Sequence, residues 1–288
     1  MLELNLAGVG GIGMSNIDEI TQHFLDTIEE GQYAIKEVGY TEGLADGKKL
    51  SSGVSWDNFQ DKGNRKDYDR AFMYWDDIEE LSPKHKVVPT GQCIYLFYSC
   101  SNLRVIDKSK FDLSKADYNE VAYAGMMLCT YCTSLEVFPD IGLQAGDYLA
   151  TWMGCSELHT IEMLRVNEDI SVAPSAFRGC RKLQHILDIE GLFGQNVSFV
   201  QCSALTPAAM KNIIKHLKIY KQTELEYEYT ITFNSTAFAV LEAEGISEED
   251  WEWLSEQFPN VNIELVKLMV EDSWEKLVGL CLGWNLVA

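Results

Sequence analysis

The stretch that decides the fold reads Trp152-Met153-Gly154-Cys155-Ser156-Glu157-Leu158, and Ile161 follows it. The same arrangement returns as Phe177-Arg178-Gly179-Cys180-Arg181-Lys182-Leu183, followed by Ile186. Each copy of this repeat unit has a large apolar residue, then a cysteine, then a leucine, and an apolar residue shortly afterwards. Three further copies are centred on Cys100, Cys132 and Cys202.

The spacing of the repeat units predicts a repeat fold. The cysteines at positions 100, 132, 155, 180 and 202 are separated by 32, 23, 25 and 22 residues. Steps of about 20–29 residues are typical of leucine-rich-repeat solenoids. One unit cannot bury its apolar face alone, but stacked units share a continuous core. We therefore predict an α/β leucine-rich-repeat solenoid in which the leucine opens a short strand and the residues before the cysteine form the opposite wall.

The repeat cysteines are interpreted as packing residues. Cysteine is small and often buried, and its thiol donates weakly to a carbonyl oxygen. One cysteine per unit, with no adjacent partner, favours a structural role over metal binding or reactivity. Cys129-Thr130-Tyr131-Cys132 is a C-x-x-C pair, but no second pair stands at the distance of a zinc site. No metal site is predicted.

The periodicity changes after Leu205. Thr206 is a predicted N-cap and Pro207 the first residue of a helix that runs to Leu217. A strand is predicted at 229–233, helices at 236–244 and 248–257, and a strand at 261–266. These helix-plus-strand repeats are expected to continue the solenoid and to cover its open end, because terminal repeats need a polar outer face.

The region before the repeats is expected to have a different role. Residues 1–50 are predicted to be an attachment element with a glycine-rich start. Its amphipathic helix, within residues 16–37, has apolar positions at Ile17, Ile20, Phe24 and Ile28. This helix either docks on the solenoid or forms a homo-oligomer with its copies, and the sequence leaves both open. The solenoid itself is predicted to span residues 51–288, with an irregular N-terminal cap at about 51–95.

A glycine motif near the N-terminus is interpreted as a loop. Gly8-Val9-Gly10-Gly11-Ile12-Gly13 matches the G-x-G-x-x-G pattern of dinucleotide-binding folds, and Glu29 or Glu30 stands near the place of a ribose-binding acid. However, no alternating series of strands and helices follows to complete a doubly wound sheet. No cofactor-binding residue is therefore predicted.

Catalytic patterns are lacking elsewhere in the sequence. No H-E-x-x-H, G-x-S-x-G or P-loop motif occurs. The histidines are scattered, at positions 23, 85, 159, 185 and 216. We predict no catalytic residue and no enzymatic activity.

The charge of the chain limits its partners. The formal net charge is −21, and residues 221–288 hold 14 acidic and 3 basic residues, a net −11. A surface this acidic is repelled by nucleic acid and by anionic membranes, so neither is an expected partner. No apolar run reaches the length of a membrane helix, and the first residues lack the basic and apolar regions of a signal peptide. Synthesis in a cytoplasm is therefore expected.

Beyond the repeat units, several segments carry a resemblance to a known family. They are residues 42–48, residues 56–65 (Trp-Asp-Asn-Phe-Gln-Asp-Lys-Gly-Asn-Arg) with Tyr68 and Ala71-Phe72, Pro83-Lys84, residues 193–199 and residues 282–286. In this order they resemble the leucine-rich-repeat, tail-associated structural proteins encoded by phages and prophages of Gram-positive gut bacteria. The repeat style is shared with BspA-like surface proteins. The first 15 residues and residues 259–270 depart from the pattern.

The resemblance, which covers most of the chain from about residue 39, implies a function. It implies a virion structural protein, tail- or particle-associated, that presents a repeat surface for protein–protein interaction or host recognition. The expected partners are other virion proteins and a polysaccharide or protein of the host cell surface. The resemblance supplies no catalytic, cofactor-binding or metal-binding residue. The alternative is a bacterial leucine-rich-repeat adhesin, which requires an export route.

Overall fold

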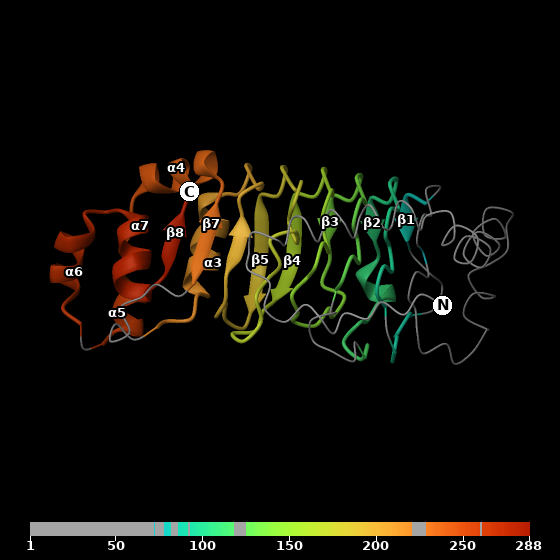
Figure 1. The fold of residues 1–288 in the computed structure, drawn as a ribbon, viewed down its shortest axis with the longest axis horizontal. Helices are drawn as coiled ribbons and strands as arrows, with labels where there is room; N and C mark the ends of the chain where they lie inside the picture. The colour runs from blue at the N-terminus through green and yellow to red at the C-terminus, as the bar shows by residue number, and fades with distance from the viewer. Residues whose placement is uncertain are drawn as a thin grey trace, which may run out of the picture.

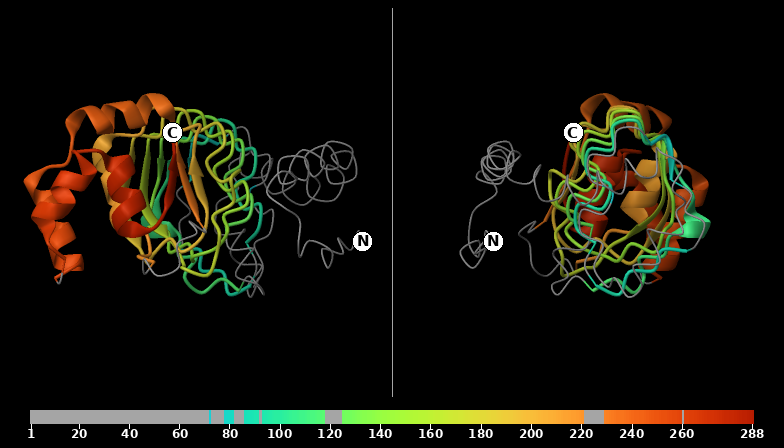
Figure 2. Two further views of the ribbon diagram at one scale, coloured as in Figure 1. Left: turned by 60° about the vertical axis from the view of Figure 1, so that its left-hand side comes forward. Right: turned by 90° about the vertical axis from the view of Figure 1, so that its right-hand side faces the viewer.

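The computed structural model describes residues 72, 78–81, 86–91, 93–117, 125–220, 229–259 and 261–288. These residues form an elongated stack of turns, with most of the helices gathered at the C-terminal end (Figure 1). Viewed along the stack, successive turns overlay one another (Figure 2). Buried apolar side chains fill the interior of the turns. The predictions for residues 1–50, including the glycine motif and the amphipathic helix, lie outside the described residues.

The strands of the described residues are short and form three parallel sheets. The first sheet pairs β1 (Glu80–Leu81) with β2 (Val105–Ile106). The second has the order β3 (Val137–Phe138), β4 (Thr160–Arg165) and β5 (His185–Glu190). The third has the order β6 (Val197–Phe199), β7 (Thr230–Phe233) and β8 (Asn285–Val287).

The helices of the described residues, apart from the short 3-10 helix η2 (Lys108–Lys110), all follow Leu205. They are α3 (Pro207–Lys215), α4 (Ser235–Glu244), α5 (Glu248–Gln257), α6 (Ile263–Val270), α7 (Trp274–Leu277) and the π-helical turn η4 (Val278–Leu282). In the described part of the chain, no helix combines the length and the apolar character needed to cross a membrane.

The predicted leucine-rich-repeat solenoid is wrong for the part of the chain that the structure describes. Such a solenoid requires a strand from every unit in one continuous sheet, whereas the strands described here belong to three separate small sheets. The fold is therefore a mixed α/β arrangement. The predicted helix-plus-strand repeats are also wrong, because the strand predicted at 261–266 to complete the last repeat is absent, and α5, α6 and α7 follow one another.

Local residues explain why the sheets are interrupted. β2 ends where Asp107 caps η2 by accepting from the backbone N–H of Ser109. β3 ends before Pro139, which has no N–H to donate. After β5, the next chain segment to lie alongside is α3, because Thr206 accepts the N–H of Ala209 and so starts a helix. A helix cannot extend the sheet, and the second sheet stops there.

The third sheet lies on a different wall from the first two. β1 to β5 follow the leucine end of the turns, but β6 precedes Cys202 and ends at Phe199. It corresponds to the residues before the cysteine in the earlier turns, which have irregular turn structure there.

The turns nevertheless pack directly against one another in chain order. Thr160 lies beside His185, and Ile161 beside Ile186, an offset of 25 residues. The same offset separates Cys155 from Cys180. The leucines of the five units are buried, at positions 103, 135, 158, 183 and 205.

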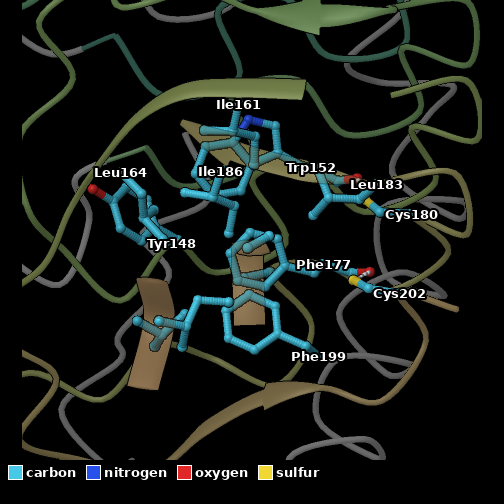
Figure 3. Packing of buried hydrophobic residues seen from close by; sticks show 14 of the residues in the cluster. Tyr148, Trp152, Ile161, Leu164, Phe177, Cys180, Leu183, Ile186, Phe199 and Cys202 are labelled. Carbon is cyan, nitrogen blue, oxygen red and sulfur yellow. Dashed lines mark hydrogen bonds between the residues drawn. The ribbon is translucent and has the colours of Figure 1, made fainter. Parts of the chain in front are cut away.

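Aromatic rings stack through the interior of the last turns. Trp152 and Phe177 are nearly parallel with centroids 5.2 Å apart, and Phe177 and Phe199 are 4.7 Å apart (Figure 3). The series continues from Phe199 to Phe233 at 5.9 Å and from Phe233 to Phe238 at 6.0 Å. We call this series the aromatic stack. It connects the turns with α4 in one continuous core.

Most C-terminal elements match the sequence predictions, and one does not. The predicted strand at 229–233 and the helices at 236–244 and 248–257 are observed as β7, α4 and α5. The predicted strand at 261–266 is wrong, because α6 begins there at Ile263. Asn262 accepts the N–H of Leu265 and caps this helix. Residues 261–266 alternate between apolar and polar side chains, as strand residues do, but the N-cap at Asn262 starts a helix there.

Candidate functional site: an apolar groove in the C-terminal cap

The repeat cysteines line the interior and donate to the backbone of the preceding turn. Cys132 donates to the carbonyl oxygen of Phe97 at 2.9 Å, and Cys180 to that of Trp152 at 3.0 Å. Cys155 donates to Cys129 at 3.0 Å. Cys100 and Cys202 follow the same rule, with acceptors Phe72 at 2.8 Å and Phe177 at 4.0 Å. We call this series the thiol ladder.

Burial makes the thiols of the ladder unreactive, because it raises the pKa of a thiol. It raises the pKa of Cys180 to about 12 and holds the pKa of Cys155 and Cys202 well above the ordinary range. A neutral thiol is neither a good nucleophile nor a metal ligand. Among the residues that the structure describes, no group of three or more His, Cys, Asp or Glu side chains is placed to hold a metal ion.

The C-x-x-C pair is a consequence of the repeat. In other turns, the residue three positions before the ladder cysteine is aromatic, as with Trp152 before Cys155 and Phe177 before Cys180. In the turn of Cys132 that position is Cys129, which is fully buried. Its carbonyl oxygen accepts the thiol of the next turn, as the aromatic residues do elsewhere. The pair therefore occupies two separate positions of one packing pattern.

The described histidines belong to separate turns and serve local contacts. His159 Nδ1 lies 2.9 Å from the hydroxyl of Thr160, and His216 Nδ1 lies 2.7 Å from the carbonyl oxygen of Asn212. His185 begins β5. His23 and His85 lie outside the described residues.

The feature that stands out chemically is an apolar groove of about 420 Å³ beside α6. We name it the cap groove. Four parts of the chain line it: the segment after α3, the end of α5 with the following loop, α6, and η4. Its principal side chains are Leu254, Phe258, Leu265, Met269, Leu280 and Cys281. Asn262 also lines it, but its side chain is committed to capping α6.

The apolar surface around the groove is unusually exposed. Of the twelve large apolar residues that are exposed in the described part of the chain, five fall within residues 261–280. Leu265 is 56% exposed, Leu268 75% and Met269 54%. In α6 only Val270 is buried. Leu265, Leu268 and Met269 are spaced i, i+3 and i+4 and so share one face of α6, which therefore presents an exposed apolar face suited to a partner.

Ion pairs to α3 hold α5, one of the helices that line the groove. Asp250 of α5 is buried and pairs with Lys211 at 3.0 Å and Lys215 at 2.9 Å, both from α3. Burial alone would raise the pKa of Asp250, but hydrogen bonds from Ser247, Lys215 and Lys211 lower it to about 2. The carboxylate is therefore charged at neutral pH and fastens α5 to α3.

α6 and α7 are positioned by tryptophans. Trp274 is fully buried and donates its indole N–H to the carbonyl oxygen of Gly245 at 3.0 Å. Lys267 lies over the ring of Trp251, 5.7 Å from its centroid, and pairs with Glu264 at 3.3 Å. These contacts leave the opposite face of α6, with Leu265 and Met269, toward the groove.

Cys281 is the one described cysteine that is not fully buried. It lines the cap groove, and partial burial raises its pKa to about 11. It is outside the repeat pattern, and no functional role was predicted for it.

Sequence reasoning missed the groove for an identifiable reason. Residues 261–266 were predicted to be a strand, which would have buried their apolar side chains against a sheet. The informative signal was the helix cap at Asn262 followed by Leu265, Leu268 and Met269, whose i, i+3, i+4 spacing places them on one face of a helix.

Comparisons of the chain with protein-family models, curated proteins and solved structures find no match. What this chain does must therefore be inferred from its own residues and their geometry.

Proposed function

We propose that this chain is a phage virion structural protein, tail- or particle-associated, that binds another protein through the cap groove. Its role is binding and not catalysis. The observation that carries the proposal is the exposed apolar surface of α6 beside a groove of about 420 Å³. The virion assignment is supported by the ordered sequence segments that resemble phage tail-associated proteins.

The exposed surface supports binding on energetic grounds. Soluble proteins rarely leave neighbouring large apolar side chains in water, and such patches mark interaction sites. Burying a fully exposed Leu or Met side chain contributes about 1.5–3 kcal/mol, and Leu265 and Met269, at 56% and 54% exposed, would contribute about half of that. A groove lined by helices accepts the apolar face of a partner segment, and anchors spaced along a helix are a common solution.

The stack of turns supports the proposal that the chain presents the cap groove to a partner protein. The thiol ladder and the aromatic stack join each turn to the one before it along the interior. Ion pairs do the same outside, as Arg165 does with Asp140 at 2.8 Å and with Glu190 at 2.9 Å. A rod of this kind holds the cap groove at the opposite end of the stack from β1 and β2 (Figure 1).

Mass spectrometry of purified particles tests the virion assignment. Virions are prepared from the strain that carries this sequence, and their proteins are compared with those of the lysate after particle removal. We expect the chain in the particle fraction at a fixed ratio to other structural proteins. Its absence from intact particles would overturn the assignment, and its removal by proteolysis of intact uninfected cells would instead support the adhesin alternative.

Crosslinking tests the groove itself. A photoreactive residue in place of Leu268, next to the groove, should crosslink a second protein in the particle. The same group in place of Leu187, which is exposed on β5 far from the groove, serves as the control. Equal crosslinking from both positions would show that the groove has no special role.

A further inference from the structure

We infer that the segment held by the cap groove is positively charged as well as apolar: an amphipathic helix with Lys or Arg beside its apolar anchors. This inference rests on the proposed binding role of the groove and specifies its partner. It is carried by the charge of the residues that surround the apolar surface.

The C-terminal cap is strongly acidic. Residues 229–288 contain 11 Asp and Glu residues but only 2 Lys and no Arg, a net charge of −9. Both lysines already face carboxylates: Lys267 pairs with Glu264 and Glu248, and Lys276 pairs with Glu271. From α3, Lys211 and Lys215 also pair with Asp250. Counting Lys211, Lys215 and Lys218 as well, 11 acidic and 5 basic residues still leave a net charge of −6.

Two of these carboxylates adjoin the groove in sequence and are open to solvent. Glu264 lies between the lining residues Ile263 and Leu265, and its side chain is 80% exposed. Glu256 is exposed in the last turn of α5, two residues before Phe258. An apolar surface with acidic neighbours attracts a cationic partner and repels an anionic one.

The same charge argues against a second copy of this chain as the occupant. The amphipathic segment at residues 16–37 has apolar positions that suit a groove, but it carries six acidic residues and one basic residue. Like charges on both sides would oppose its docking. We therefore assign the groove to a different, basic segment.

The first experiment measures binding of the full-length chain to two synthetic helical peptides by fluorescence anisotropy. Both peptides carry the same Leu and Phe anchors at positions i, i+4 and i+7. Their other positions are Lys and Arg in one peptide and Glu in the other. We expect the cationic peptide to bind at least about ten-fold more tightly at low salt. This ratio should shrink as salt is added, because salt screens exposed charges. Equal binding, or tighter binding of the acidic peptide, would overturn the inference.

Matched variants locate the binding. Leu265→Ser should weaken binding of the cationic peptide at least about ten-fold, whereas Leu187→Ser, at an equally exposed leucine on β5, should leave it unchanged. The double variant Glu256→Gln with Glu264→Gln should reduce the preference for the cationic peptide. Asp169→Asn, an exposed acid in a distant turn, should not. Circular dichroism and unfolding midpoints establish that each variant is folded.

The outcomes separate the two proposals. If both peptides bind equally and Leu265→Ser abolishes both, the groove binds protein but the charge inference fails. If neither peptide binds, nor any virion protein, the groove proposal fails with it. If sedimentation shows a dimer that Leu265→Ser dissociates, a second copy occupies the groove, and the assignment to a basic partner is overturned.

Discussion

The middle turns bury their large apolar side chains, whereas the C-terminal cap leaves several of its own exposed to solvent. Between residues 125 and 205 each turn has a neighbour on both sides, so Leu158, Leu183 and the rings of Trp152, Phe177 and Phe199 are buried. In the cap, α6 packs on one side only, and Leu265, Leu268 and Met269 stay exposed. Both regions are rich in apolar residues. What differs is the number of neighbours, which makes the end of the stack the place where binding surface is left over.

The largest expected effect compares leucines from the two regions. Leu183→Ala should lower the free energy of unfolding by about 2–5 kcal/mol, because it removes a fully buried side chain and leaves a cavity. Leu268→Ala should change it by no more than about 0.5 kcal/mol, because Leu268 is largely in water. Urea unfolding of both variants measures the difference. Similar losses from both would mean that α6 is covered within the chain.

A glycine pair tests how tightly the turns are stacked. Gly154 and Gly283 both have positive φ, +76° and +74°, so alanine strains the backbone at either position. At Gly154 an added Cβ would also lie 2.5 Å from the ring of Tyr131 in the preceding turn, whereas at Gly283 the nearest atoms, those of Tyr220, lie at an ordinary contact distance of 3.4 Å.

Gly154→Ala should therefore destabilise the protein by about 2–3 kcal/mol and Gly283→Ala by about 1–2 kcal/mol. Adding Tyr131→Ala should remove the excess at Gly154. Thermal or urea unfolding of the three variants measures this, and an identical cost at both glycines would show that the turns are loosely spaced.

The buried carboxylate of Asp250 gives the cap its own pH dependence. Its pKa is lowered from 3.8 to about 2 in the folded protein. The stabilisation is therefore complete above about pH 4 and is lost as the pH falls through 2. It should amount to about 1–2 kcal/mol once solvent screening is allowed for.

The measurement compares wild type with Asp250→Asn by urea unfolding between pH 6 and pH 2. The gap between the two free energies should narrow toward low pH. Parallel curves would show that Lys211 and Lys215 do not stabilise this carboxylate.

The sequence predicted the burial of the repeat leucines and cysteines, but it did not predict how the strands of successive turns pair into sheets. The buried leucines and the packing role of the cysteines follow from residues that recur with the same neighbours. The fold class did not follow, because strand length depends on single residues after each unit, such as Asp107, Pro139 and Thr206. The groove could not be read from periodicity at all, because an apolar helix is exposed or buried according to what lies beside it.

The smallest expected effect concerns the two classes of cysteine and leaves stability unchanged. Cys281 is half-buried beside the groove, while Cys155 and the other ladder cysteines are fully buried. Only Cys281 should therefore react with iodoacetamide in the native protein, which mass mapping of the labelled peptides would show. Its rate should rise with pH toward the pKa of about 11, because the thiolate is the nucleophile. A ligand in the groove should slow this reaction without altering the ladder thiols. Early labelling of Cys155 instead would mean that the turns open more readily than the cap, which is the reverse of the difference between the two regions.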